Sequence, residues 1–149
     1  MIRRARPEDA EAVVRIFRES RAEAMPWLPV LHTPEEDLDF FRRALGREAY
    51  VFDLDGAVAG FIVLRDAMLD ALYVAPRLQG RGVGSALLER AEEARPDGFR
   101  LWVFRENRHA RRFYEARGCR LIRETDGAAN EERTPDALYE WAPPAEAEA

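Results

Sequence analysis

Lysine is absent from this chain of 149 residues, and all 23 of its basic residues are arginine. A Schiff-base mechanism and a phosphate-binding P-loop both require a lysine amine, so the sequence excludes both. Cysteine occurs once, at Cys119, and the two histidines, His32 and His109, are far apart. An internal disulfide is therefore impossible, and we expect no metal site.

Long apolar runs are also missing. No stretch approaches the roughly 20 apolar residues that a membrane-spanning helix needs, and the opening MIRRARPEDAEAVV lacks the apolar core of a signal peptide. We therefore expect a cytoplasmic protein that does not bind membranes. The net charge of −5 argues against a nucleic-acid binder, because such binding needs a surplus of basic side chains facing phosphates.

The pattern of apolar residues predicts a mixed α/β fold. We assign residues 1–142 to a single domain and residues 143–149 to a flexible tail. The expected order is a strand, two helices, a hairpin around Asp55-Gly56, a strand, a helix, a strand, a helix and two strands. This order predicts a mostly antiparallel central sheet of six to seven strands flanked by about four helices. Only the strand–helix–strand unit within residues 69–104 requires parallel neighbours.

A glycine-rich turn, LQGRGVGSALLERAEE at residues 78–93, leads directly into a helix pattern. The first turn of a helix has N–H groups without partners and the positive end of the helix dipole, and glycine lets a ligand approach the backbone. With Arg77 and Arg81 beside Gly80, Gly82 and Gly84, the turn predicts a diphosphate site. A turn without a ligand is the other interpretation. The spacing Gly-x-Gly-x-Gly does not match dinucleotide-binding folds.

Two segments resemble the GNAT superfamily of acyl-CoA-dependent N-acyltransferases. LDALYVAPRLQGRGVGSALL, residues 69–88, is similar to the family's acyl-CoA-binding segment, in which Gln/Arg-x-x-Gly-x-Gly/Ala follows a strand that ends in Val-x-Pro. Residues Gln79, Gly82 and Gly84 match this pattern. NRHARRFYEARGCRLI, residues 107–122, is similar to a later family segment at Asn107, Ala110, Phe113, Tyr114 and Gly118. The resemblance is weak before residue 50, where the family builds its substrate sites.

The resemblance implies acetyl-CoA as the acyl donor and a GNAT-like fold. Strands 69–74 and 100–104 would diverge to admit the thioester, and the pantetheine arm would pair like an added strand with the backbone of Leu72, Tyr73 and Val74. Asn107 would contact the pantetheine amides, which is compatible with its capping a helix. The diphosphate would bind to the glycine-rich turn, at Gln79, Gly80, Arg81, Gly82, Val83, Gly84 and Ser85.

Two residues are candidates for acid–base catalysis. Tyr114 matches the family tyrosine near the thioester sulfur, which implies a general acid for the leaving thiolate; core packing is the ordinary role of such a helix aromatic. An alkylamine, with a pKa near 10.4, must lose a proton before it attacks. Asp70 is the candidate base, because strand alternation places it on the same face as Leu72 and Val74. A structural role for Asp70, or a water chain instead of one base, remains open.

The remaining polar residues point to direct attack by the amine. Cys119, at the start of an apolar strand, is typical of an inert buried thiol, so no acyl-enzyme is expected. His32, Glu131 and Glu132 lie in two loops and are candidates for substrate binding, although solvated surface charge explains them equally well.

We therefore predict an N-acetyltransferase that moves an acetyl group from acetyl-CoA to a primary amine of a small molecule, amino acid or peptide. A non-catalytic acyl-CoA-binding sensor or partner module is the alternative, and a binder of nucleotide diphosphates is a third possibility. The expected partner is the amine substrate, and the sequence leaves a homodimer open.

Overall fold

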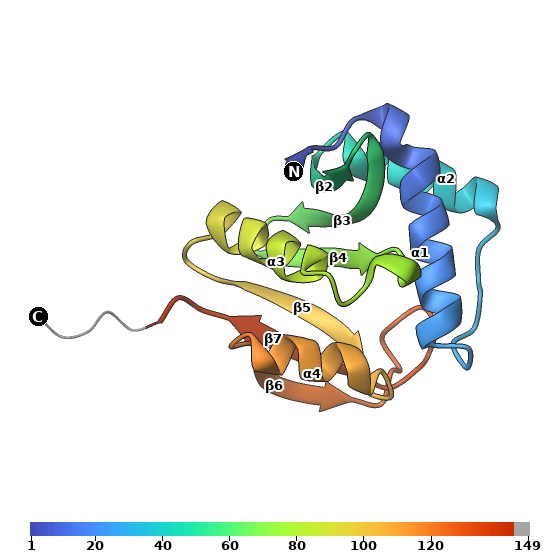
Figure 1. The fold of residues 1–149 in the computed structure, drawn as a ribbon. Helices are drawn as coiled ribbons and strands as arrows, with labels where there is room; N and C mark the ends of the chain where they lie inside the picture. Colours follow the sequence, from blue (N-terminus) through green and yellow to red (C-terminus); the bar gives the residue numbers. More distant parts are fainter. Residues whose placement is uncertain (145–149) are drawn as a thin grey trace, which may run out of the picture.

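The computed structural model describes residues 1–144, which form a seven-stranded open sheet with helices on both faces (Figure 1). Two short 3-10 turns, η1 (Pro7–Asp9) and η2 (Pro76–Leu78), precede α1 and α3. The other elements are, in chain order, β1 (Ile2–Arg4), α1 (Ala10–Ala24), α2 (Pro34–Leu45), β2 (Glu48–Leu54), β3 (Ala57–Arg65), β4 (Met68–Val74), α3 (Val83–Ala94), β5 (Phe99–Phe104), α4 (Arg108–Ala116), β6 (Arg120–Thr125) and β7 (Asp136–Trp141). Residues 145–149 of the predicted tail lie outside the described residues.

The strand order is β1-β2-β3-β4-β5-β7-β6. Every neighbouring pair is antiparallel except β4 and β5, which are joined through α3 and run parallel. The predicted order of elements and the mixed, mostly antiparallel sheet are therefore confirmed.

Alternating apolar residues place a core on each face of the sheet. In β3, Phe61 and Val63 pack with α1 and α2, whereas Ile62 and Leu64 pack with α3 and with Tyr114 of α4. Both faces are buried because the period-2 strand pattern meets apolar helix faces on either side. Helices thus pack on both faces of the sheet around β4 and β5.

Local sequence signals set the boundaries of several elements. Thr33 accepts a hydrogen bond from the Glu36 amide at 3.1 Å, and the Glu36 carboxylate accepts one from the Thr33 amide at 2.8 Å, which forms a capping box at the start of α2. Asp55 and Gly56 both have positive φ, as a tight hairpin turn requires. No helix in residues 1–144 is long and apolar enough to cross a membrane.

Candidate functional site

The strands β4 and β5 diverge from one end to the other. Met68 and Arg100 form the one ladder pair between them in the described strands, and the Arg100 amide donates to the Ala67 carbonyl at 2.9 Å. On its other side β4 stays paired with β3 up to Val74. Beyond Met68, β4 therefore has no ladder pairing with β5 along Leu72, Tyr73 and Val74; we call this stretch the gap, and an added extended ligand would pair with the backbone here.

The glycine-rich turn lies at the wide end of this gap. Gly80 and Gly82 have φ of +80° and +85°, and Gly82 is the N-cap of α3. L-residues with a Cβ rarely adopt this conformation, so the shape of the turn itself requires glycine. The turn is anchored by Gln79, whose side-chain amide donates to the Val74 carbonyl at 3.2 Å. The first turn of α3 thus adjoins the end of β4.

Gly84 and Ser85 face α4. A Cβ added to Gly84 would lie 3.3 Å from two ring carbons of Phe113, so glycine here permits α3 and α4 to approach closely. The Ser85 hydroxyl accepts a hydrogen bond from Arg117 at 2.9 Å, and the Arg117 guanidinium lies 4.0 Å from the centre of the Phe113 ring. Arg117, which the sequence pattern did not single out, therefore adds a positive charge beside the turn.

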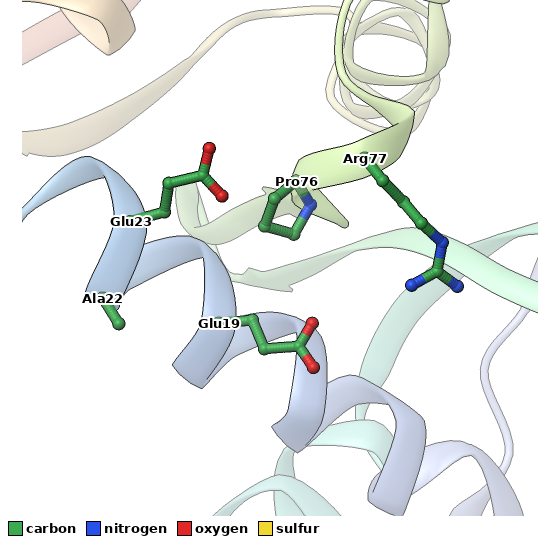
Figure 2. A pocket seen from close by; sticks show the side chains of 5 residues that line it. All are labelled: Glu19, Ala22, Glu23, Pro76 and Arg77. Atoms are coloured by element: carbon green, nitrogen blue, oxygen red, sulfur yellow. The ribbon is translucent and has the colours of Figure 1, made fainter.

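The two other basic residues of the turn differ in their surroundings. Arg81 is exposed to solvent, close to the buried Val83 that begins α3. Arg77 borders a hollow of about 500 Å³ between α1 and η2, opposite Glu19 and Glu23 (Figure 2). Arg81 and Arg117 are thus better placed than Arg77 to meet an anion at α3.

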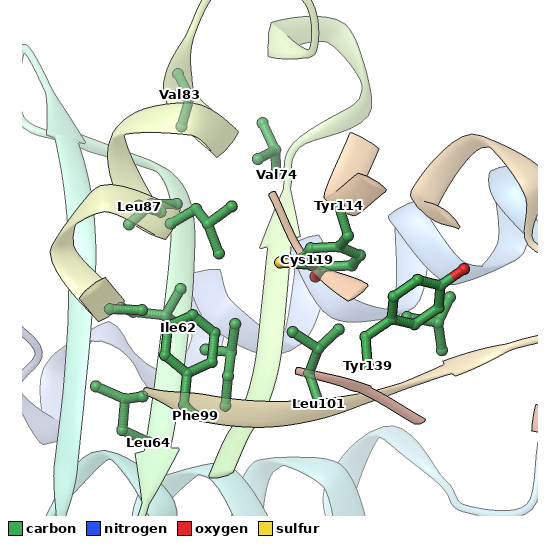
Figure 3. Packing of buried hydrophobic residues seen from close by; sticks show 14 of the residues in the cluster. Ile62, Leu64, Val74, Val83, Leu87, Phe99, Leu101, Tyr114, Cys119 and Tyr139 are labelled. Atoms are coloured by element: carbon green, nitrogen blue, oxygen red, sulfur yellow. The ribbon is translucent and has the colours of Figure 1, made fainter. Parts of the chain in front are cut away.

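Tyr114 projects from α4 into the core. It is buried with Val74 of β4 and Leu101 of β5, beside Cys119 (Figure 3). Burial raises the pKa of the Tyr114 phenol well above its ordinary value, so the hydroxyl keeps its proton. That hydroxyl has no hydrogen-bond partner among the described residues, which leaves its proton available for a ligand.

Cys119 and Asn107 have the local surroundings that the sequence suggested. Cys119 is buried, and desolvation raises the pKa of its thiol to about 12, so it remains a thiol. The Asn107 side chain accepts a hydrogen bond from the Ala110 amide at 3.2 Å and caps α4. Within residues 1–144, no group of three His, Cys, Asp or Glu side chains is arranged to hold a metal ion.

The expectation that Asp70 shares a face with Leu72 and Val74 is wrong. Ala71 pairs with Val63 and Leu69 with the next residue, Leu64, so Asp70 is the extra residue of a β-bulge. The bulge interrupts strict alternation, and Asp70 faces the cleft on the α1 and α2 side of the sheet. Its carboxylate accepts hydrogen bonds from Arg65 at 2.8 and 3.2 Å.

A cleft of about 1260 Å³ lies on that side. Its walls come from α1, the α1–α2 loop, α2, the β3–β4 hairpin and the β6–β7 loop. His32 and Glu131, from the two loops, are in contact across it. Three of its lining residues, Val30, Leu31 and Phe40, are large apolar side chains exposed to solvent. The structure therefore brings the loop residues selected from the sequence to one cleft.

Arg21 of α1 lies where this cleft meets the diverging strands, and sequence reasoning missed it. Its Nε donates to the Tyr73 hydroxyl at 3.3 Å, and its guanidinium lies 5.8 Å from the ring centre of Phe104, the last residue of β5. Glu132 forms an ion pair with it at 3.5 Å. No sequence signal identifies Arg21, because it is one arginine among many on a helix of mixed polarity.

Comparison with known proteins gives consistent results. The model of the acetyltransferase (GNAT) family matches residues 11–119. Over 123 residues the chain is 34% identical to the peptidyl-lysine N-acetyltransferase YjaB of Salmonella typhimurium, covering 80% of this chain and 83% of that protein. It is 28% identical over 125 residues to the peptidyl-lysine N-acetyltransferase YiaC of Escherichia coli, covering 82% and 84%. The solution structure of apo YjaB from Escherichia coli superimposes with a TM-score of 0.80 at 26% identity, covering 96% and 97%.

Proposed function

This chain belongs to the acetyltransferase (GNAT) family, and from that premise we propose that it acetylates the side-chain amine of lysine in peptides or proteins. The family makes the chain an acyl-CoA-dependent N-acetyltransferase. The proposal adds the acceptor and the roles of individual residues. The cleft beside the diverging strands β4 and β5, with exposed apolar side chains along its lining, is the observation that carries the acceptor.

The residues present fit acetyl-CoA as the donor substrate. The open edge of β4 offers backbone partners for the amides of the pantetheine arm at Leu72, Tyr73 and Val74. The first turn of α3, with Arg81 and Arg117 near it, offers amide donors and positive charge for the diphosphate. The substrate supplies an activated thioester, and the protein has to orient it in the gap.

Tyr114 is proposed to assist the departure of the thiolate. A phenol whose pKa is raised by burial is a poor proton donor to the leaving thiolate, because the thiol that would form has an ordinary pKa of only about 8.5. It remains a good hydrogen-bond donor to an anion in an apolar site. We therefore assign Tyr114 as the hydrogen-bond donor that stabilises the leaving sulfur.

A peptide acceptor fits the cleft better than a small amine. Val30, Leu31 and Phe40 are apolar side chains exposed along the lining of the cleft, and a small amine would not cover them. A peptide can cover these side chains while its lysine reaches toward the diverging strands. The two peptidyl-lysine acetyltransferases that resemble the chain support the same acceptor class.

A direct test is to incubate the purified protein with acetyl-CoA and a library of lysine peptides, and to follow thiol release and peptide mass. The chain itself contains no lysine, so every acetyl-lysine detected must belong to the added acceptor. We expect a mass increase of one acetyl group on lysine. Acetylation of small amines alone would contradict the peptide acceptor, and tight CoA binding without turnover on any amine would favour a sensor.

A further inference from the structure

The Arg21 guanidinium lies over the gap between β4 and β5, on the cleft side. Tyr73, to which it donates, is in β4, and Phe104, beneath it, ends β5. The Phe17 ring of α1 packs on the same guanidinium at 4.7 Å. An amine that enters from the cleft and attacks a thioester held in the gap must therefore pass next to Arg21.

The only carboxylate that pairs with Arg21 among the described residues is that of Glu132. The Glu132 side chain is only 16% exposed, and its Oε2 lies 3.5 Å from Nη2 of Arg21. No hydrogen bond to Oε1 is found within residues 1–144. One oxygen thus faces the arginine while the other remains free to accept a hydrogen bond.

The β6–β7 loop holds Glu132 in a defined position. Asn130 donates to the carbonyl of Thr134 at 2.6 Å and to Asp136 at 3.0 Å, and it accepts from the Thr134 amide at 3.1 Å. The Thr134 hydroxyl in turn donates to the Glu132 carbonyl at 3.0 Å. These bonds tie residues 130–136 together and to the start of β7, so the carboxylate is preorganised rather than carried on a free loop.

The other carboxylates of the cleft are more firmly engaged or more exposed. Asp37 accepts from Arg18 at 2.6 Å, Asp70 is bonded twice by Arg65, and Glu131 contacts His32. Glu19 and Asp39 project from exposed helix positions. Glu132 therefore combines low exposure with an uncommitted oxygen next to the gap.

We propose that Glu132 receives the ammonium group of the acceptor, and that Arg21 is the positioning residue that holds its carboxylate at the mouth of the gap. This inference rests on the proposed lysine acceptor. A charge-assisted hydrogen bond to a partly desolvated carboxylate favours a cationic acceptor over a neutral one of the same shape.

The test compares two peptides that differ only in lysine or norleucine, bound to the protein loaded with CoA so that no turnover occurs. We expect the wild type to bind the lysine peptide about tenfold more tightly. In Glu132→Gln the ratio of the two affinities falls close to one, and Glu132→Asp restores part of the preference for the lysine peptide. Arg21→Gln lowers the preference as well, while the affinity for CoA stays near the wild-type value.

Glu124→Gln is the matched control, because Glu124 of β6 pairs with Arg105 and does not line the cleft; it keeps the wild-type preference. A folded Glu132→Gln variant that retained the tenfold preference would overturn the role of Glu132 alone. A wild type that bound both peptides equally and acetylated neither would overturn the proposed lysine acceptor, and the role of Glu132 with it. Mass analysis of the lysine peptide after addition of acetyl-CoA separates these two failures.

Discussion

Met68 pairs with Arg100 at the closed end of β4 and β5, and beyond this pair the two parallel strands separate. Separation leaves the facing backbone groups of two central strands unpaired with each other, and the Gln79 side chain bonds to one of them, the Val74 carbonyl. The gap opens toward the glycine turn on one side and toward Arg21 and the cleft on another. Donor and acceptor substrates can therefore approach the same point from different directions.

Replacement of Tyr114 by Phe tests the hydroxyl directly. We expect kcat to fall about 100-fold, because the leaving sulfur loses its donor, while the affinity for CoA changes little. The free energy of unfolding should not fall, since the hydroxyl has no partner among the described residues and its removal leaves no buried group unsatisfied. Thiol release and thermal unfolding measure the two effects.

The matched control is Tyr139→Phe. The Tyr139 hydroxyl, unlike that of Tyr114, is fully engaged: it accepts from Arg111 at 2.9 Å and donates to Glu115 at 2.5 Å, both of α4. This variant should lose stability and keep its kcat. A Tyr114→Phe enzyme with wild-type turnover would remove Tyr114 from the mechanism.

Gly82→Ala should weaken CoA binding about tenfold, because a left-handed N-cap cannot hold its shape once a Cβ is added and the amides of the first α3 turn reorient. Gly56→Ala serves as its control. Gly56 has φ of +88° and, like Gly82, has no atom within 4 Å of an added Cβ. Both variants should lose about 1 kcal/mol of stability. Equal CoA affinities in the two variants would show that the α3 turn does not bind the donor.

Sequence patterns predicted the elements of the fold because each has a local cause. Glycine at positive φ made the β2–β3 turn, and a capping box began α2. The glycine turn was found for the same reason. Gly84 shows the limit: its spacing suggested close approach of a ligand, whereas the structure shows close approach of Phe113. Local patterns cannot tell which neighbour a missing Cβ accommodates.

The acceptor side was far less predictable. The bulge at Asp70 depends on the register of β4 against β3, which no local pattern reveals, and one inserted residue moved the side chain to the other face. Arg21 owes its position to contacts with Tyr73, Phe104 and Glu132, which are far away in sequence. Residues of this kind become visible only when the tertiary fold brings their partners together.

Asp70→Asn should have little effect on turnover. Arg65 donates a hydrogen bond to each oxygen of the Asp70 carboxylate in a partly exposed pair, so neither oxygen is left unpaired to accept a proton from the amine. We expect kcat/KM within about threefold of wild type and a stability loss of no more than about 1 kcal/mol. The pH profile of kcat/KM checks the prediction: loss of its acidic limb in the variant would restore Asp70 as the base.

The ionisation of Asp9 makes the free energy of unfolding depend on pH. The buried Asp9 carboxylate accepts two hydrogen bonds from Arg3, both at 2.9 Å, and one from the Arg6 amide at 2.8 Å. The hydrogen bonds from Arg3 lower the pKa of Asp9 below its ordinary value. A lowered folded-state pKa means that the stabilisation is fully present above the unfolded pKa of about 3.9 and is lost as the pH falls through the folded value.

Asp9→Asn should therefore cost about 2 kcal/mol in urea unfolding at pH 7, because asparagine cannot accept all of these hydrogen bonds and leaves Arg3 poorly paired. The difference between wild type and variant should remain constant down to about pH 5 and shrink at lower pH. Glu8→Gln, at the exposed neighbouring position, should stay within about 0.5 kcal/mol of wild type throughout. A difference that grew on acidification would mean that Asp9 is more easily protonated in the folded chain than in the unfolded one, contrary to the pairing with Arg3.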